Sequence, residues 1–416
     1  MDLSNYHHIL DDIVPRKFIN CEITNLKCKV FDTFKNYCKN NNITKIIVSL
    51  SGGVDSMVIA YCAVHCGLDV IGGHMNYGNR EETLEEQKFL EDWCKLYGIK
   101  FELLTFGELK RGEDSRDEYE RETRKMRYNF YGELVEKYNA TGIFLGHHSN
   151  DVAENLFCNV MHGRSLEDLS VIRSKSEVMG VTVYRPFRDL WKGDIIEFAL
   201  VNMVPYFKDT TPDWSNRGKL RRQIFPMIEC VFERALQRKL YGMAVQSDEL
   251  GEILREMVVM PFVEKCRFYG NGLVMEVHDR ERLQNMTFWV LVMREVMHGR
   301  GESMPKQKVM GVMVERLKIG REFKMDFKVG WKLYYRDGEV YIVREELVNF
   351  WKDLRGEYDA WRWMFRLYEG DNLEEMFFEG GMIDGKGRMF VNPKGARGRK
   401  LVKIRNPVGK WEIYLE

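Results

Sequence analysis

The sequence predicts an α/β protein with a parallel sheet in its N-terminal half and a smaller mixed helical and α+β C-terminal half. First, short apolar runs such as Ile46–Val48 alternate with stretches of helical apolar spacing up to about residue 226. Second, this rhythm stops after Phe225. Third, two short strands flank Arg336-Asp337-Gly338-Glu339, and Asp-Gly is typical of a β-hairpin turn.

The N-terminal elements follow in a regular order. We expect helices at 26–39, 57–66, 81–96, 119–137, 151–161 and 192–201, and strands at 45–48, 69–74, 100–106, 142–146 and 181–184. Strands separated by helices pair in parallel through right-handed crossovers, and ligands of such sheets bind beyond the carboxyl ends of the strands. The loop after the first strand, His74 at the end of the second strand and residues 146–148 after the fourth strand all fall on that edge.

The C-terminal half shows helical patterns at 226–258, 286–296 and 305–317, with Pro305 early in the last of these, and strands at 331–335 and 340–343. Residues 386–410 contain nine Lys or Arg and no Asp or Glu. We therefore divide the chain into an N-terminal extension (1–25), an α/β domain (26–226), a helical linker with a second domain (227–345) and a basic C-terminal region (346–416).

Composition argues against a globally basic nucleic-acid-binding protein, a disulfide-linked secreted protein and a membrane protein. The 416 residues are 44% hydrophobic and carry a formal net charge of zero, so any nucleic-acid surface must be local. The nine cysteines form no CxxC pair, and we see no signal peptide or transit peptide, which favours a reducing, cytoplasmic setting. No apolar run approaches the length that spans a bilayer, so we expect no membrane partner.

One polar loop lies between the first strand and the next helix. It consists of Ser51, Gly52, Gly53, Val54, Asp55 and Ser56. Glycines permit a tight turn and a close ligand, and a helix N-terminus attracts phosphate. Asp55 beside a phosphate indicates an intervening Mg²⁺. The loop lacks the lysine of GxxxxGK[ST] and the spacing of GxGxxG, and resembles instead the loop of enzymes that split ATP into AMP and pyrophosphate.

The segment Gly146–Asn155 follows a predicted buried strand. Asp151 and Glu154 lie three apart at a helix start, so they share a face that suits a metal or an ammonium group. His147 and His148 would donate to phosphate or act as a base. The alternative is a capped helix with solvated charges.

Two basic segments are candidates for phosphate binding. Arg124 and Arg127 share a helix face and would hold phosphates, although a salt-bridged exposed helix explains them equally well. The second segment is a polar loop near Trp214 that suits an RNA backbone, or else a solvated linker. Its basic residues are Arg217, Lys219, Arg221 and Arg222.

Taken in order, these motifs resemble one family. They are SGGVDS at 51–56, His74 after the second strand, ExxxRxxRY at 120–128, GHHxNDxxEN at 146–155, Arg185-Pro186 and a D…R…R…P run from 209 to 226. Their order and spacing over residues 27–226 resemble the catalytic domain of tRNA(Ile)-lysidine synthetase. The resemblance implies an adenine-nucleotide α-hydrolase-like, Rossmann-like fold for this domain.

The resemblance also implies a reaction and roles for the residues. The family uses ATP to adenylate the wobble cytidine of an isoleucine tRNA with a CAU anticodon, releases pyrophosphate, and then joins L-lysine to carbon-2 with loss of AMP. Residues 51–56 and His74 would bind ATP, Asp55 would also hold Mg²⁺, and Asp151 and Glu154 would recognise lysine. His147, His148, Arg124 and Arg127 would assist catalysis. The four basic residues of the 217–222 segment, the second domain and the basic C-terminal region would bind tRNA. The sequence leaves open whether the chain forms a homodimer.

Three other readings stay open as well. A tRNA thiolase of the same fold would need a sulfur carrier or a cluster, usually shown by CxxC pairs, which are absent here. An amide-forming ATP pyrophosphatase would bring a glutaminase domain, which we do not find. A tRNA-binding paralogue without catalysis would not need the intact loop and carboxylates.

Overall fold

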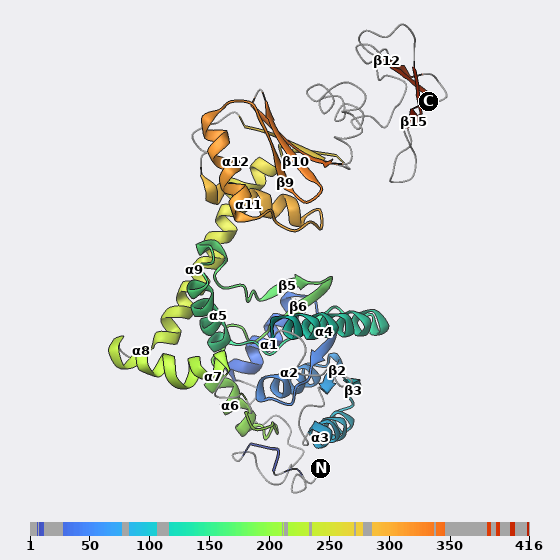
Figure 1. Ribbon diagram of the computed structural model, residues 1–416. Coiled ribbons are helices and arrows are strands. Elements are labelled where there is room, and N and C mark those ends of the chain that lie inside the picture. The colour runs from blue at the N-terminus through green and yellow to red at the C-terminus, as the bar shows by residue number, and fades with distance from the viewer. Residues whose placement is uncertain are drawn as a thin grey trace. The chain divides into compact units, whose positions relative to one another are not determined.

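The computed structural model describes residues 6, 8–11, 28–76, 83–105, 116–209, 211, 215–232, 235–269, 272–277, 285–336 and 338–345, and four short strands between 381 and 415. These residues form two compact units that divide between Gly251 and Glu252, coloured along the chain in Figure 1. None of the helices in the described ranges is long and apolar enough to span a membrane.

The first unit contains a six-stranded sheet in the order β3-β2-β1-β4-β6-β5. The strands are β1 Lys45–Ser49, β2 Asp69–Asn76, β3 Lys100–Thr105, β4 Ile143–Phe144, β5 Lys175–Val178 and β6 Val181–Tyr184. The helices are α1 Lys29–Asn40, α2 Val54–His65, α3 Thr83–Leu96, α4 Arg116–Tyr138, α5 Ser149–Met161, α6 Lys192–Val201, α7 Asn216–Lys219, α8 Phe225–Phe232 and α9 Leu236–Leu254, whose last three residues belong to the second unit. A 3₁₀ turn (Leu166–Asp168) and a π-helical segment (Leu220–Ile224) complete it. The predicted parallel pairing is confirmed for β1, β2, β3, β4 and β6.

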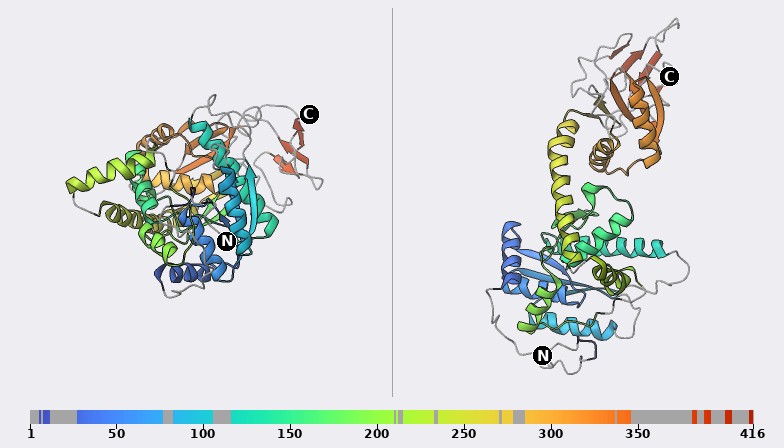
Figure 2. Two further views of the ribbon diagram at one scale, coloured as in Figure 1. Left: turned by 90° about the horizontal axis from the view of Figure 1, so that it is seen from below. Right: turned by 90° about the vertical axis from the view of Figure 1, so that its left-hand side faces the viewer.

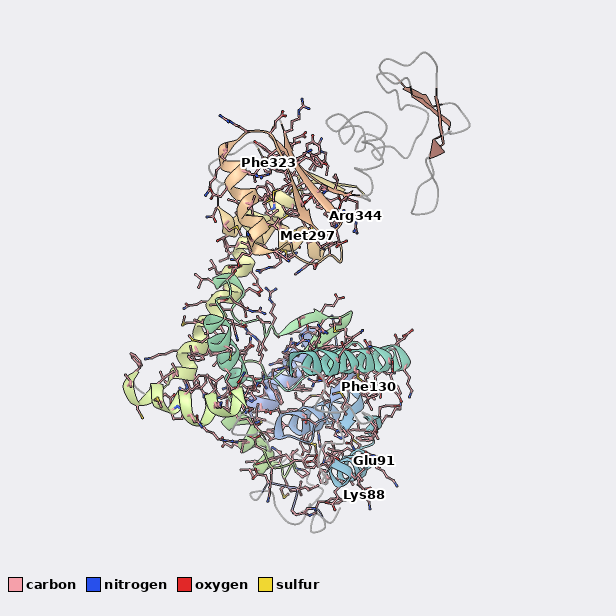
Figure 3. All side chains as sticks on the ribbon, viewed as in Figure 1. Lys88, Glu91, Phe130, Met297, Phe323 and Arg344 are labelled. Carbon is pink, nitrogen blue, oxygen red and sulfur yellow. The ribbon has the colours of Figure 1, made fainter. Side chains whose placement is uncertain are left out.

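Both faces of the central strand β1 are buried, which explains why its apolar run has no alternation. Ile46 and Val48 pack into the core formed with α1, α2, α3 and α6, whereas Ile47 packs into the core formed with α4. A strand covered on both faces reads as a continuous hydrophobic run. The helices on either side of the sheet can be followed in Figure 2, and Phe130 of α4, labelled in Figure 3, belongs to the second of these cores.

The chain order places a switch point between β1 and β4. From β1 the chain builds outward to β2 and β3, and it then returns to the other side of β1 to add β4 and β6. Ile47 and Val48 of β1 pair with Ile143 and Phe144 of β4. A crevice opens outside the carboxyl ends of the strands at such a point, which positions the segments after β1 and β4 for ligand binding.

The edge strand β5 was not predicted, and it pairs antiparallel with β6 through residues 175–178. It is four residues long, and its side chains alternate between exposed and half-buried, so it carries no apolar run.

The second unit has its own core and a five-stranded antiparallel sheet in the order β7-β8-β11-β10-β9. The strands are β7 Arg267–Tyr269, β8 Gly272–Glu276, β9 Phe323–Lys328, β10 Trp331–Arg336 and β11 Glu339–Arg344. The helical elements are a π-helical segment (Arg255–Val259), α10 Met260–Val263, α11 Met286–His298 and α12 Gln307–Ile319. Met297 of α11, labelled in Figure 3, lies in this core.

The predicted hairpin is confirmed, because Arg336 pairs with Glu339 across the turn and Gly338 has a φ of +83°. The prediction that Pro305 lies within the following helix was wrong. The helix begins at Gln307 after an extended Lys306, so Pro305 precedes it. Four further strands pair antiparallel in the order β12-β13-β14-β15: Gly381–Ile383, Arg388–Val391, Lys400–Lys403 and Tyr414–Leu415. The remainder of the basic stretch at 386–410 lies outside the described residues.

Candidate active site

The loop after β1 is tight because it folds against another segment. Gly52 has a φ of +79°, and its carbonyl oxygen accepts a hydrogen bond from the backbone N–H of Phe207 at 2.9 Å. A Cβ atom at position 52 would lie 2.0 Å from Cε2 of the Phe207 ring. The position therefore requires glycine for its backbone conformation and for the close approach.

The two serines of the loop hold its shape. The backbone N–H of Ser51 donates to Ser56 Oγ at 3.2 Å, and Ser56 Oγ donates to the Gly53 carbonyl oxygen at 2.9 Å. Gly53 is the N-cap of α2, and Val54 is its first residue. The predicted strand–loop–helix arrangement is confirmed, with the positive end of the α2 dipole directed at the loop.

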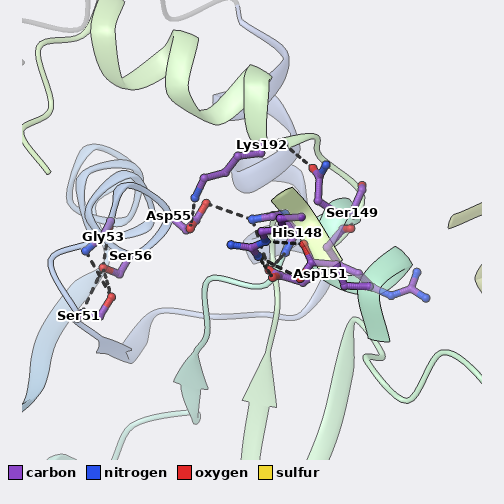
Figure 4. A network of polar contacts seen from close by, with 12 residues as sticks. Ser51, Gly53, Asp55, Ser56, His148, Ser149, Asp151 and Lys192 are labelled. Carbon is purple, nitrogen blue, oxygen red and sulfur yellow. Dashed lines mark hydrogen bonds and ion pairs between the residues drawn. The ribbon is translucent and has the colours of Figure 1, made fainter. Parts of the chain in front are cut away.

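The segment between β4 and α5 brings His147 and His148, the N-cap residue of α5, to the same place. A Cβ atom on Gly146 would lie 2.8 Å from Cβ of Asp55, so the end of the β4 segment packs directly on the loop. His148 Nε2 lies 3.8 Å from Asp55 Oδ1 and 3.4 Å from Asp151 Oδ2. Figure 4 shows His148 between these two carboxylates. One buried imidazole thus joins the predicted nucleotide loop to the predicted amine site.

The two carboxylates predicted to recognise lysine are buried and hold an arginine. The exposed fractions of the Asp151 and Glu154 side chains are 8% and 3%. Arg221 donates from Nε to Glu154 Oε1 at 2.5 Å, and from Nη2 to Glu154 Oε2 at 3.1 Å and to Asp151 Oδ1 at 3.2 Å. The carboxylate pair therefore binds a cation in this structure, and that cation belongs to the chain itself.

Burial sets the protonation of the two histidines. It lowers the pKa of His147 to about 4; the Asp151 carboxylate opposes this shift, and the charges of Arg185 and Arg217 add to it. Burial also lowers the pKa of His148, against the opposing charges of Asp151 and Asp55. Both rings are therefore neutral near pH 7.

Asp151 stays ionised at the same pH. Burial raises the pKa of its carboxyl group. His148 and His147, which are protonated in the acid range where this carboxyl titrates, Arg217, and the backbone N–H of His148, which donates to Asp151 Oδ2 at 3.1 Å, outweigh burial and lower the pKa below its usual value. The capping interpretation of this residue is thereby confirmed alongside its place in the cavity.

The tautomers of the neutral rings differ in what they offer. Arg185 Nε donates to His147 Nδ1 at 3.3 Å, so the proton of His147 is on Nε2 and the ring is a donor there. His148 Nε2 faces two carboxylates, which would stabilise the imidazolium formed when this ring takes a proton. His74 donates from Nδ1 to the Leu50 carbonyl oxygen at 2.8 Å beside the loop.

A single cavity of about 1300 Å³ contains these groups. It is lined by the loop after β1, His74, the two histidines before α5, the two carboxylates of α5, and by Arg124, Arg127, Arg217 and Arg221. Arg124 is exposed and Arg127 half-buried at its wall. Lys219 and Arg222 are exposed outside the lining, and Trp214 lies outside the described residues. The structure thus separates the 217–222 segment into two residues that face the cavity and two that do not.

The sequence reasoning gave no role to Lys192 or Arg185, although Arg185 stood in one of its motifs. Lys192, the first residue of α6, places Nζ 2.6 Å from Asp55 Oδ2, as Figure 4 shows. Arg185 is buried and also donates from Nη1 to the Arg173 carbonyl oxygen and to Ser176 Oγ, so it fixes the orientation of His147. Neither contact is local in sequence, and no spacing rule indicates it.

Asp55 offers a carboxylate oxygen to the predicted Mg²⁺. Asp55 Oδ1 is buried and has no hydrogen-bond partner among the described residues. In those residues no group of three or more His, Cys, Asp or Glu side chains is arranged to hold a metal ion by itself. Mg²⁺ commonly takes one or two carboxylates and completes its shell with substrate phosphates and water. The orphaned oxygen of Asp55 therefore fits this cation in company with a nucleotide.

Comparisons with known proteins agree with this geometry. A family model described as a PP-loop domain matches residues 26–228, which implies ATP binding. The tRNA(Ile)-lysidine synthase of Chlamydia felis is 30% identical over 233 residues, covering 56% of this chain and 72% of that protein. The synthase of Chlamydia muridarum is 30% identical over 250 residues, covering 59% and 77%.

Among solved structures, a U34-tRNA thiolase from Methanococcus maripaludis with a [4Fe-4S] cluster aligns with a TM-score of 0.43 and 16% identity, over 54% of this chain and 79% of that chain. The family follows from three findings: the 30% identity to the two synthases, the share of their length that this chain covers, and the matched PP-loop domain. The chain belongs to the tRNA(Ile)-lysidine synthase family of tRNA-modifying PP-loop enzymes.

Proposed function

We propose that this protein joins L-lysine to carbon-2 of the wobble cytidine of a tRNA(Ile) with a CAU anticodon, at the expense of ATP. The observation that carries the proposal is the shared cavity: the phosphate loop and the buried carboxylates of α5 line one space, with His148 within 3.8 Å of both. Had Asp55 and the carboxylate pair opened onto different cavities, no single substrate could have joined them.

In the first step, the cytosine O2 attacks the α-phosphorus of ATP and pyrophosphate leaves. The loop N–H groups and the α2 N-terminus would hold the leaving diphosphate. Arg124 and Arg127 at the cavity wall and His147, which donates from Nε2, would neutralise the transferred phosphoryl group. A Mg²⁺ held by Asp55 Oδ1 would spread charge at the α-phosphate when bound.

In the second step, the lysine ε-amine attacks carbon-2 and the C–O bond to AMP breaks. Asp151 and Glu154 would present the amine, because two buried carboxylates favour an ammonium. An ammonium is not nucleophilic, so it must lose a proton before attack. His148 is neutral and lies between two carboxylates, so it is the group best placed to accept that proton.

For the RNA substrate, we propose that Lys219 and Arg222, the second unit and the basic C-terminal region contact tRNA phosphates. Both side chains are exposed beside the cavity segment. Arg217 is exposed and lines the cavity. Arg221 would contact RNA only after leaving the carboxylates, so its assignment to tRNA stays a prediction. Binding through such contacts weakens steeply with salt.

The test is incubation of the purified protein with Mg²⁺, ATP, radiolabelled lysine and a tRNA transcript with a CAU anticodon. We expect label in the tRNA fraction, with one pyrophosphate released per lysine. Asp55→Ala and Glu154→Gln should abolish incorporation. Asp69→Asn is a matched control, because Asp69 pairs with Lys45 at the opposite end of β1 and β2. ATP turnover without lysine incorporation would refute the amine assignment and favour a thiolase reaction.

A further inference from the structure

Lys192 stands at a point that connects three parts of the first unit. It is the first residue of α6, and its backbone N–H donates to Asn150 Oδ1 of α5 at 3.0 Å. Its ammonium reaches across to Asp55 at the start of α2, with Nζ 2.6 Å from Oδ2. The side chain is 35% exposed and lines the cavity. Its backbone is therefore fixed, while its charged end is open to a ligand.

The phosphate loop lacks a cation of its own. Residues 51–56 contain no Lys or Arg, whereas common nucleotide loops carry a lysine that contacts the terminal phosphates. An ammonium has three protons to donate. Asp55 is the acceptor at hydrogen-bond distance among the described residues, so two protons remain for oxygens of a ligand in the cavity.

We propose that Lys192 binds the β- and γ-phosphates of ATP and the pyrophosphate that leaves, supplying from α6 the positive charge that other phosphate loops carry within the loop. Asp55 positions it through Oδ2, while the separate oxygen Oδ1 remains for a cation. As the bond between the α-phosphorus and the bridging oxygen breaks, negative charge gathers on the leaving diphosphate, and the Lys192 ammonium stabilises it there. This inference deepens the proposed function and rests on its nucleotide half alone.

The experiment measures the binding of magnesium pyrophosphate by calorimetry, without lysine, tRNA or turnover. We expect Lys192→Met to weaken binding by about 10- to 100-fold, which is the ratio that one charged hydrogen bond contributes. Lys192→Arg should recover part of this loss because it retains the charge. In steady state, the KM for ATP should rise by a similar ratio, while the KM for lysine stays within about twofold.

Lys29→Met is the matched control. Lys29 Nζ pairs with Asp194 Oδ2 in the first turn of the same helix at 3.0 Å, and its side chain is exposed outside the cavity lining. It should bind pyrophosphate like the wild type.

Pyrophosphate binding that is unchanged in Lys192→Met would overturn the proposal. Equal weakening in Lys29→Met would also overturn it, because the effect would then come from the position of α6. If Lys192→Met fails to fold, Lys192→Gln is used with the same expectations. A wild-type protein that binds pyrophosphate through Lys192 but incorporates no lysine would refute the amine assignment and leave this inference standing.

Discussion

Arg221 occupies the site that the proposed function assigns to lysine, so its removal should make lysine bind more tightly. The variant Arg221→Met keeps the length of the side chain and removes the charge. Breaking a buried ion pair by removing one partner costs about 3–5 kcal/mol. Arg221 is 32% exposed, so water offsets part of this, and we expect a loss of about 2–3 kcal/mol. For a unit of about this size, the melting temperature should fall by roughly 4–12 °C.

Added lysine should then restore stability in the variant more than in the wild type. In the wild type, lysine must displace Arg221 at a cost of about 2–3 kcal/mol, which weakens its apparent affinity roughly 30- to 150-fold. At a lysine concentration equal to the wild-type Kd, the wild type gains about 0.4 kcal/mol and the variant about 2–3 kcal/mol. Thermal unfolding with and without lysine measures the difference.

Two controls and one outcome decide whether Arg221 competes with the lysine amine. Arg222→Met changes the neighbouring residue, whose guanidinium donates to the Thr211 carbonyl oxygen at 3.1 Å and is exposed, and it should leave the lysine effect unchanged. Norleucine, which lacks the ε-amine, should not produce the larger gain. A lysine effect in Arg221→Met that is no larger than in the wild type would show that Arg221 does not compete with the amine.

Three further predictions concern Gly52, His147 and Arg185. Gly52→Ala should lower the free energy of unfolding by about 2–4 kcal/mol and abolish ATP binding, because the new Cβ would meet the Phe207 ring and the backbone φ is +79°. Thermal unfolding measures the loss of stability. Gly53→Ala, whose nearest contact would be 3.5 Å away, should lower stability much less. The lowered pKa of His147 means that the folded state binds fewer protons than the unfolded state in acid. The contribution of the neutral His147 ring to the free energy of unfolding is therefore complete above about pH 6.5 and is lost as the pH falls to about 4. The ring is half-buried, so we expect this contribution to the free energy of unfolding to be about 1–2 kcal/mol. Denaturant unfolding of His147→Gln should show a free energy of unfolding that depends less on pH between 4 and 6.5 than that of the wild type. An unchanged pH dependence would contradict the prediction. Arg185→Met should raise the pKa of His147, because a buried positive charge is removed, and imidazole proton NMR resonances should report the shift; a pKa that falls or stays would refute the assigned contact.

Local patterns predicted the sheet and the ligand edge well. The continuous run Ile46–Val48 indicated a buried strand, and the positions of Ser51 and His148 after predicted parallel strands indicated a shared ligand edge. Both inferences depend on near-neighbour spacing and on the regular geometry of parallel sheets.

What the sequence could not indicate were contacts between distant residues. Arg221 is 67 residues from Glu154, and Lys192 is 137 residues from Asp55. A basic residue in a polar loop reads as a surface cation until the fold shows an anion opposite to it. The edge strand β5 (residues 175–178) escaped for a different reason: it is short, and none of its side chains is fully buried.

The two walls of the cavity come from different crossovers, β1 to α2 and β4 to α5. Under the proposed function, substitutions on α5 would alter which nucleophile is accepted without disturbing the turn assigned to the nucleotide. One scaffold could in this way give rise to catalysts that share an activated intermediate and differ in the attacking group. Redesign for another amine should begin at Glu154 and leave the Gly52 turn intact.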